Sequence, residues 1–369
     1  MPWIHEAVVV GVVESQREES DMTGTMLAAV VRRRGGPEVI SVERVPIPTI
    51  RAGQALVRVR ASALNRVDIW DRTGPPQPIF PWTEREYPHI SGNDAVGEVA
   101  SLADDTGTVA VGDRVAVYIG LSCGRCEYCI RGEQTMCLEY RIFGEHTQGA
   151  FAQYVAVPVA NLERIPDGLD FRAAATASAF TTAWRLVVTA GRVEPGMTVL
   201  VLAAGGGVGS AAMQVALRAG ATVFASASTE EKRRKAIAHG AVGATDHTNP
   251  FSGWVLEQTN GRGVDVVVDS LGSTWPESIR SLARGGRLVV CGATLDNRPS
   301  FDIRELYQRH RSICGAPLGN RREFNHVLRM LGDRSLTPIV DSEFPLARIR
   351  DAHRRAETRE AFGRIIVTI

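Results

Sequence analysis

The sequence predicts an α/β protein in which a doubly wound parallel sheet is joined to a β-rich, partly barrel-like region. From Met26 to about Pro166, short strands alternate with turns bounded by Gly, Pro or Asp, the pattern of a β-rich region. From about Ala173, continuous apolar strands alternate with amphipathic helices. That pattern is typical of a parallel sheet covered on both faces. The 369 residues are enough for two domains of ordinary size.

The expected elements follow from these two patterns. The first region contains strands bounded by turn residues, at 55–64, 95–102, 112–120 and 149–158. The second region contains strands at 198–204, 222–228, 264–272 and 287–294, with helices at 209–220, 230–241 and 279–286. After Ala316 we expect helices at 322–333 and 347–358 and strands at 340–346 and 363–369. We expect these last segments to return to the first region.

The composition excludes several classes of partner. A net charge of +1 creates no bulk field that would favour nucleic acid or an anionic membrane. The sequence contains no apolar run of eighteen residues, so we expect no membrane span. The stretch AVVVGVV is too short for a signal peptide and lacks its flanks. Six cysteines without an export signal favour metal binding over disulfides, and hence the cytoplasm.

A glycine cluster, AAGGGVG, ends one apolar strand and opens the next helix. Aligned to the dinucleotide-binding pattern G-x-G-x-x-G, it places Ala204, Gly206 and Gly209 at the three glycine positions. Such a turn lets the backbone approach a pyrophosphate, and the helix N-terminus supplies N–H donors. The context of strand, turn, helix and further βα units predicts a dinucleotide site. The alternative is a glycine turn that only packs helix on strand.

The end of the following strand indicates which nucleotide binds. An acidic residue there would accept a hydrogen bond from the ribose 2′-hydroxyl of NADH. The sequence has Ala227, flanked by Ser226 and Ser228, and the cations of Lys232 to Arg234 follow. Without a carboxylate to repel a 2′-phosphate, NADPH is favoured, with NADH still possible. The alternative is that Lys232 to Arg234 form only a solvated helix face.

Four of the six cysteines form a C-x2-C-x2-C-x7-C pattern, at Cys123, Cys126, Cys129 and Cys137. Four closely spaced thiolates can surround one zinc ion tetrahedrally, and such a closed site has no open position for water or substrate. We therefore predict one structural Zn²⁺; the alternative is four unrelated free thiols. Cys291 and Cys314 are interpreted as packing residues.

The order of the motifs resembles that of the medium-chain dehydrogenase/reductase superfamily, which includes zinc alcohol dehydrogenases and quinone oxidoreductases. The motifs are GGPEVISVERVPIP, the cysteine lobe, AAGGGVG, VDVVVDSLG, GGRLVVCGAT and GRIIVTI. The resemblance covers roughly 26–369. It implies a GroES-like catalytic domain with a partly closed β-barrel, split by an inserted Rossmann domain. The boundaries we expect are a poorly ordered extension at 1–24, the catalytic domain at 25–172 and 317–369 with its zinc lobe at 120–140, and the Rossmann domain at 173–316.

The chain departs from zinc alcohol dehydrogenases at the catalytic zinc. The resemblance places the three ligand positions at Asn65, at Asn93 within Gly92-Asn93-Asp94, and near Ala177. Asn is a poor zinc ligand and Ala is none. The family's proton relay falls on Val67 and Trp70, which cannot carry protons. We therefore expect no catalytic zinc, as in the quinone oxidoreductase-like branch, which commonly has an N-x-x-D stretch, here Asn65 to Asp68.

The resemblance also implies a set of cofactor contacts. Arg66 and Arg364 fall at positions that contact the pyrophosphate, and His247 falls where related reductases carry a Tyr near the adenosine phosphate. The complete set of residues expected to bind the cofactor is Arg66, Ala204, Gly206, Gly207, Val208, Gly209, Ser226, Ser228, Lys232, His247, Gly292 and Arg364.

Without zinc, hydrogen-bond donors must meet the developing oxyanion. We assign this role to the amides of Asn65 and Asn93, and Thr181 to a contact with nicotinamide or substrate, unless its hydroxyl is an interior helix group. The leading hypothesis is an NADPH-dependent reductase of activated C=C, enone or quinone substrates. The alternatives are a zinc-dependent alcohol or carbonyl dehydrogenase, with ligands such as Asp94 or His89, and a nucleotide-binding protein without turnover. We expect a small-molecule substrate and a homodimer or homotetramer.

Overall fold

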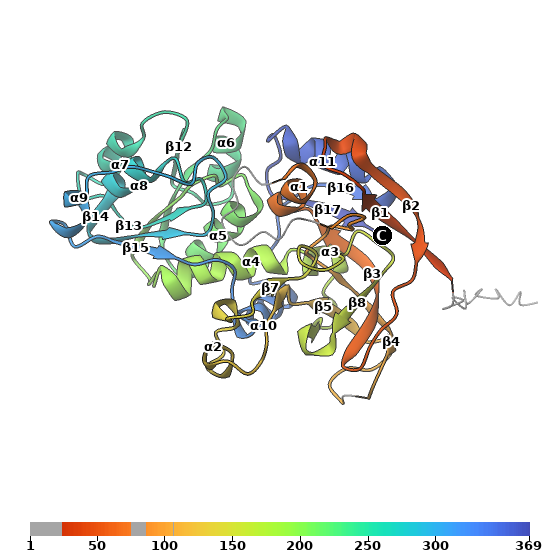
Figure 1. Ribbon diagram of the computed structural model, residues 1–369. Coiled ribbons are helices and arrows are strands. Elements are labelled where there is room, and N and C mark those ends of the chain that lie inside the picture. The colour runs from red at the N-terminus through yellow and green to blue at the C-terminus, as the bar shows by residue number, and fades with distance from the viewer. Residues whose placement is uncertain (1–23, 75–85, 106) are drawn as a thin grey trace, which may run out of the picture.

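A computed structural model describes residues 24–74, 86–105 and 107–369. Two halves lie side by side in Figure 1: an α/β half that contains β10 to β15, and a β-rich half that contains both ends of the described chain. The poorly ordered extension expected at 1–24 falls outside the described residues, except for Gly24.

The α/β half is built on a six-stranded parallel sheet with the order β12-β11-β10-β13-β14-β15. Its strands are β10 (Thr198–Val201), β11 (Thr222–Ser226), β12 (Gly243–Thr245), β13 (Val264–Asp269), β14 (Leu282–Val290) and β15 (Ser312–Gly315). The helices of this half are α5 (Gly207–Arg218), α6 (Glu230–Ala238), α7 (Ser252–Gln258), α8 (Trp275–Ser281) and α9 (Arg304–Tyr307). The strand order reverses between β10 and β13: β11 and β12 follow β10 on one side of the sheet, and β13 to β15 lie on the other. Ligands of doubly wound sheets bind at the carboxyl ends of the strands at such a point.

The β-rich half contains a seven-stranded sheet with the order β16-β17-β3-β4-β5-β9, in which β8 also pairs with β3. Its strands are β3 (Gln54–Ala63), β4 (Val96–Leu102), β5 (Arg114–Val117), β8 (Tyr154–Pro158), β9 (Leu162–Arg164), β16 (Val340–Pro345) and β17 (Arg364–Thr368). The C-terminal strand β17 pairs antiparallel with β3. Two hairpins lie beside this sheet: β1 (Thr25–Val31) with β2 (Ile40–Pro46), and β6 (Gly120–Leu121) with β7 (Arg141–Ile142).

The largest of four hydrophobic clusters among the described residues extends through both halves, and the hydrophobic core of the molecule is continuous there. This cluster includes Val96 of β4, Met213 of α5 and Phe324 of α10 (Arg321–Gly332), packed with Phe180 of α4 (Ala177–Trp184). A stretch of π-helix, Arg185–Ala190, follows α4 directly. The remaining helices are α1 (Arg66–Thr73), α2 (Glu127–Ile130), α3 (Phe171–Ala174) and α11 (Ile349–Glu357). Because α4 packs against both halves, its position helps to fix how the two halves are placed relative to each other.

One expected element is wrong. The segment 279–286 was expected to be helical, but α8 ends at Ser281 and β14 begins at Leu282, where it pairs with Val264 of β13. The pair Gly285 and Gly286 is a poor continuation of a helix, which explains the early end. Within the described ranges, no helix is long and apolar enough to cross a membrane.

Candidate active site and metal centre

The glycine loop lies between the end of β10 and the start of α5. Ala203 has a positive φ of 49°, and Gly206 is the N-cap of α5. A side chain at Gly209 would collide with the Ala203 carbonyl oxygen, so the tight return of the helix on the strand requires glycine there. The N-terminal N–H groups of this twelve-residue helix face the loop, as a pyrophosphate site needs.

Two cations from distant parts of the sequence lie against this loop. A Cβ placed on Gly207 would lie 2.7 Å from Cδ of Arg364, and one on Gly205 would lie 3.1 Å from Cδ of Lys232. The Gly363 N–H donates to the Gly205 carbonyl at 2.9 Å, which ties the start of β17 to the loop. The fold therefore brings Lys232 and Arg364, both expected cofactor contacts, to the same place. Their roles in binding stay predictions.

A third and a fourth cation lie close by. Lys232 Nζ donates to the carbonyl of Arg359, whose charge is near enough to Arg66 to lower the pKa of that guanidinium, although burial is the larger cause. In the described ranges, neither the Arg66 nor the Arg359 guanidinium forms a hydrogen bond or ion pair. The Glu357 carboxylate offsets part of the repulsion between the two guanidinium groups, and the region keeps an excess of positive charge. Sequence reasoning missed Arg359, since it lies in an irregular segment outside every motif.

The adenosine end of the expected site is more buried than the sequence suggested. Ser226 is fully buried; its Oγ accepts from the Ala203 N–H at 3.3 Å and lies 3.1 Å from Nδ1 of His247. Burial lowers the pKa of His247. Ser228 is exposed and lies beyond the end of β11. Gly292 follows β14, and a Cβ placed on it would lie 3.4 Å from the Ser270 carbonyl oxygen. Ser226 therefore bonds to Ala203 in the glycine loop, and His247 lies against Ser226.

Of the positions expected to correspond to catalytic zinc ligands, Asn65 is engaged in internal hydrogen bonds with Asp94 and Arg364. Arg364 donates from Nη1 to Asn65 Oδ1 at 2.9 Å and from Nη2 to Asp94 Oδ2 at 2.6 Å. The Asn65 amide donates to the same Asp94 oxygen at 3.0 Å and to the Ala63 carbonyl at 3.3 Å. Asp94 and Ala177 line one narrow gap. Both protons of the Asn65 amide are therefore in use in this conformation.

Two buried carboxyls, one in this cluster and one next to it, have raised pKa values. Asp68 is fully buried on α1 and accepts from the N–H groups of Asn65 at 2.7 Å and Gly92 at 3.0 Å. Burial raises the pKa of Asp68 well above its usual range, and the neighbouring Asp71 raises it further. Burial also raises the pKa of Asp94, although Arg364 opposes this effect. The N-x-x-D stretch therefore closes α1 onto the Gly92 turn.

Asn93 and Thr181 are buried polar residues in the same region. The Asn93 amide donates to the Phe143 carbonyl at 2.6 Å, while its Oδ1 has no partner among the described residues. The Thr181 hydroxyl donates to the Ala177 carbonyl at 2.7 Å, the interior helix bond that the sequence left open as an alternative. Neither arrangement tests a contact with substrate, so both catalytic assignments stay predictions.

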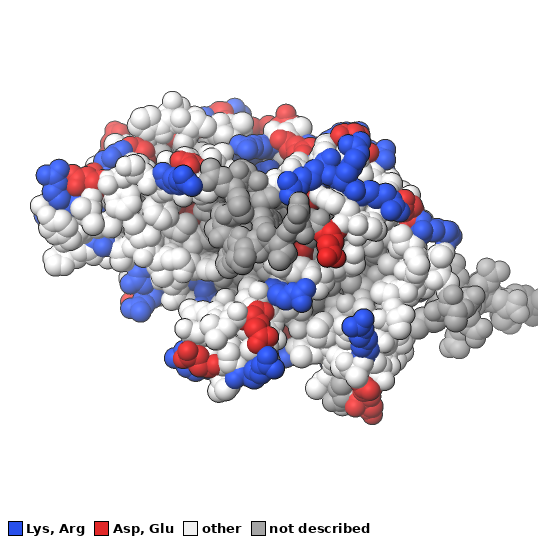
Figure 2. Space-filling model, viewed as in Figure 1, with Lys and Arg blue, Asp and Glu red and all other residues white. Residues whose placement is uncertain are grey.

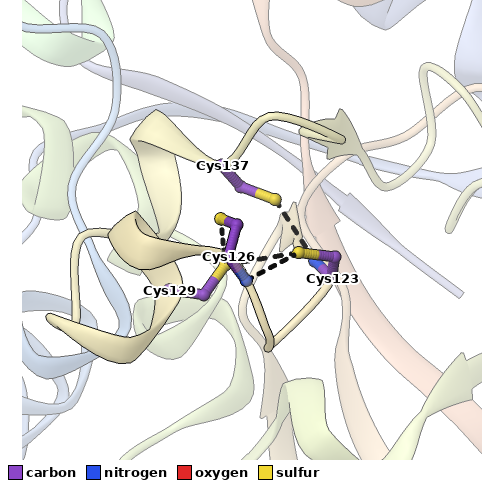
Figure 3. Close-up of side chains that lie close together, drawn as sticks. All are labelled: Cys123, Cys126, Cys129 and Cys137. Carbon is purple, nitrogen blue, oxygen red and sulfur yellow. Dashed lines mark hydrogen bonds between the residues drawn. The ribbon is translucent and has the colours of Figure 1, made fainter.

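The four cysteines converge in one lobe, as Figure 3 shows. Their sulfur atoms all lie within 4.8 Å of one another, with Cys126 and Cys129 at 3.5 Å and Cys123 and Cys129 at 4.0 Å. A tetrahedral zinc site places sulfur atoms about 3.8 Å apart, given Zn–S bonds of about 2.3 Å. Backbone N–H groups lower the pKa of Cys126 to about 6, which favours a thiolate, whereas burial raises the pKa of Cys129 to about 12. The lobe fits a closed zinc site.

A second metal cluster is not found within the described ranges, where these cysteines alone group three or more Cys, His, Asp or Glu side chains closely enough. His89, a possible alternative zinc ligand, has its Nε2 3.1 Å from the Gly144 carbonyl and 3.8 Å from Asp71. Asp94, the other alternative, is paired with Arg364.

Charge on the visible face is mixed. In Figure 2, acidic and basic side chains are interspersed over most of this face, and Lys and Arg gather over the region of α1, α11 and β2. This local gathering, rather than the net charge of +1, is the basic feature beside the expected nucleotide site.

Comparison with known proteins agrees with this architecture. Residues 51–167 match the alcohol dehydrogenase GroES-like domain, and residues 207–333 match the zinc-binding dehydrogenase family. A crystal structure of an NAD-dependent alcohol dehydrogenase is 38% identical, with a TM-score of 0.86, over 93% of this chain and all of that one. The crotonyl-CoA carboxylase/reductase of Cereibacter sphaeroides is 29% identical over 89% of this chain and 84% of its own length. The crotonyl-CoA carboxylase/reductase AntE, solved in complex with NADP, is 25% identical, with a TM-score of 0.85, over 93% and 94% of the two chains.

Proposed function

The chain belongs to the medium-chain dehydrogenase/reductase superfamily, and on this premise we propose that it is an NADPH-dependent reductase of an activated C=C bond, an enone or a quinone. Membership makes it an NAD(P)H-dependent oxidoreductase. The observation that carries the finer proposal is the Asn65–Asp94–Arg364 cluster, because it fills the catalytic zinc position with an amide and an internal ion pair.

The proposed preference for NADPH rests on charge. Lys232 lies beside the glycine loop and donates to the Arg359 carbonyl, the Arg359 charge is near Arg66, and Ala227 stands where a carboxylate would reject a 2′-phosphate. The relative AntE was solved with NADP, which supports the same choice. We propose that Arg66 and Arg359 flank the phosphates, with Lys232 behind them, and that Arg364 contacts the pyrophosphate from the other side of the loop.

We propose that the protein binds one zinc, in the cysteine lobe, and no zinc at the site of Asn65 and Asp94. The lobe would supply a structural cross-link when zinc is bound, and its four ligands leave no position for substrate. In the cleft, Asn65 and Asn93 replace two ligands and Ala177 replaces the third. The Asp94 carboxylate, which could otherwise bind a cation, is already neutralised by Arg364 at 2.6 Å.

Bound NADPH supplies a hydride to the electron-poor carbon of the acceptor, and the protein supplies position and polarisation. The acceptor oxygen gains negative charge in this step and must meet a hydrogen-bond donor. Asn93 keeps one amide proton beyond the one donated to Phe143, and we assign that proton to the oxyanion; for Asn65 to donate as well, its amide must first release Ala63 or Asp94. Thr181 is assigned to the nicotinamide side. A proton from solvent completes the reduction.

The second candidate is a zinc-dependent alcohol dehydrogenase, which the 38% identity to a solved alcohol dehydrogenase favours. Metal analysis of the purified full chain separates the two: one zinc per chain supports the reductase, and two support the dehydrogenase. NADPH oxidation is then followed with a panel of enones, enoyl thioesters, quinones and aldehydes. Turnover of the conjugated acceptors supports the proposal. Turnover of aldehydes alone contradicts it, and a non-catalytic binding protein would oxidise NADPH with none of them.

A further inference from the structure

A buried arginine ties the cysteine lobe to the helix at the junction of the two halves. Arg185 directly follows α4, and its side chain is 8% exposed. Its Nη2 donates to Glu133 Oε2 at 2.8 Å, and its Nε donates to Glu323 Oε2 at 2.9 Å. Glu133 lies within the lobe, between the third and fourth cysteines, and Glu323 lies in the first turn of α10. One guanidinium therefore holds three segments that are far apart in sequence.

The partners of Arg185 are themselves fixed. Glu323 also accepts from the Asn320 N–H at 2.7 Å and from the Thr189 hydroxyl, and Asn320 caps α10 in return. Next to this cap, a side chain at Gly319 would come within 2.5 Å of the Thr181 methyl group. Arg185 and Glu323 are largely removed from water, with side chains 8% and 5% exposed, whereas Glu133 is 34% exposed, so removing a partner would leave a poorly compensated charge on the buried guanidinium. The connection is therefore stiffer than an exposed ion pair.

The other end of α4 reaches the proposed active site. Ser178 lies seven residues before Arg185, about 10 Å along a helix at 1.5 Å per residue. Ser178 and Asp94 line the same narrow gap. Asp94 binds Arg364, which lies against Gly207 of the glycine loop. A continuous set of contacts thus runs from the lobe through α4 to the nucleotide loop.

We propose that Arg185 is a positioning residue that couples the metal state of the cysteine lobe to cofactor affinity at the glycine loop. The inference rests on the proposed function for its two ligands, zinc and NADPH. If the lobe loses its order, Glu133 releases one side of Arg185, and α4 loses the contact that fixes its C-terminal end. By linkage, zinc in the lobe then strengthens NADPH binding, and NADPH strengthens zinc retention by the same factor.

The test measures NADPH affinity by calorimetry on the zinc-loaded full chain. Glu133→Gln keeps the size of the side chain and removes the charge that Arg185 meets. We expect this variant to keep one zinc per chain and to bind NADPH at least about 5-fold more weakly, the lower end of typical coupling factors. Glu127→Gln is the matched control, because Glu127 pairs with Arg131 on the exposed surface of the same lobe. It should bind NADPH as the wild-type chain does.

A second comparison gives a result that a merely structural role would not produce. Stripping zinc from the wild-type chain should weaken NADPH binding, while stripping it from Arg185→Lys, which cannot reach both carboxylates in the same geometry, should change affinity much less. If Glu133→Gln lost its zinc, the comparison of stripped wild-type and stripped Arg185→Lys chains would alone test the coupling. Equal NADPH affinity of zinc-loaded Glu133→Gln and wild type, or equal sensitivity of both chains to stripping, overturns the coupling. If the wild-type chain bound no NADPH, the proposed function would fail, and NADH titrations of the same proteins would still test the coupling.

Discussion

Arg364 and Asp94 form a buried ion pair at the junction between β17 and the Gly92 turn, with 2.6 Å between Nη2 and Oδ2. The side chains are 6% and 3% exposed. Charges this far from water are costly unless each is paired and hydrogen bonded. Asn65 bonds to both partners, so a neutral amide completes the pair. The same guanidinium lies against the glycine loop, so one side chain takes part both in this ion pair and in the expected cofactor site.

Replacing Arg364 by Met should destabilise the fold and weaken NADPH binding together. The change leaves Asp94 buried without its cation, which typically costs about 3–5 kcal/mol. Asp94→Asn in the same chain should restore much of the stability but not the NADPH affinity, because the cation at the loop is still missing. Urea unfolding and calorimetry measure the two effects. Full NADPH affinity in the double variant would contradict the assignment of Arg364 to the cofactor.

Replacing Arg359 by Ala should lower the preference for NADPH over NADH. The Arg359 carbonyl accepts from Lys232 Nζ, and Lys232 belongs to the cations expected to favour a 2′-phosphate, so we assign the Arg359 guanidinium to that phosphate. We expect the Kd of NADPH to rise about 10-fold or more, as for loss of a charge-assisted contact, while the Kd of NADH changes little. Arg164→Ala is the control, since Arg164 is exposed, paired with Asp113 and outside the expected nucleotide site. An equal loss for both nucleotides would argue against a 2′-phosphate contact.

Cys126→Ser should remove zinc and lower stability. The site closes only with four sulfur ligands, and loss of a structural metal is among the changes that cost about 4 kcal/mol or more. Metal analysis and thermal unfolding check this. Cys314→Ser, outside the cluster, should keep the zinc and the melting temperature. Full stability of Cys126→Ser with a selective loss of turnover would instead place catalysis in the lobe.

Stability should decrease as the pH falls below about 6.5 because of His353. This imidazole is 2% exposed; burial lowers its pKa to about 3, and the nearby Arg72 adds to the shift. In the unfolded chain this imidazole is protonated near pH 6.5, whereas in the folded chain it is protonated only near pH 3. Its contribution to the free energy of unfolding is therefore fully present above about pH 6.5 and is lost progressively as the pH falls toward 3.

The expected slope from His353 is about 1.4 kcal/mol per pH unit in that window. Urea unfolding at pH 7 and pH 5 measures it, and His353→Gln should flatten the difference. His310→Asn, at an exposed position, should leave it unchanged. A wild-type stability that does not change between the two pH values, or the same change in His353→Gln, would be inconsistent with a neutral buried imidazole.

Local patterns in the sequence determined the elements, the nucleotide loop and the cysteine lobe. The apolar strand before AAGGGVG and the spacing of the four cysteines are contiguous signals, each carried by fewer than about twenty residues. Glycine spacing and thiolate chemistry depend on local backbone geometry, so these features can be read without a fold. The helix expected at 279–286 was wrong because the pairing of Leu282 with Val264 is a tertiary preference that overrides local propensity.

Only the tertiary structure decided which distant residues share a site. Arg364 meets Asn65 across 299 positions, and Arg185 meets Glu323 across 138. Arg359 lies in no motif, and nothing near it in sequence indicates that it approaches Arg66. Contacts of this kind depend on how β17 returns to β3 and how α4 packs between the halves, which the free energy of the whole core sets. The sequence by itself therefore determined the family of chemistry, and the packing of the two halves decided which side chains can take part in it.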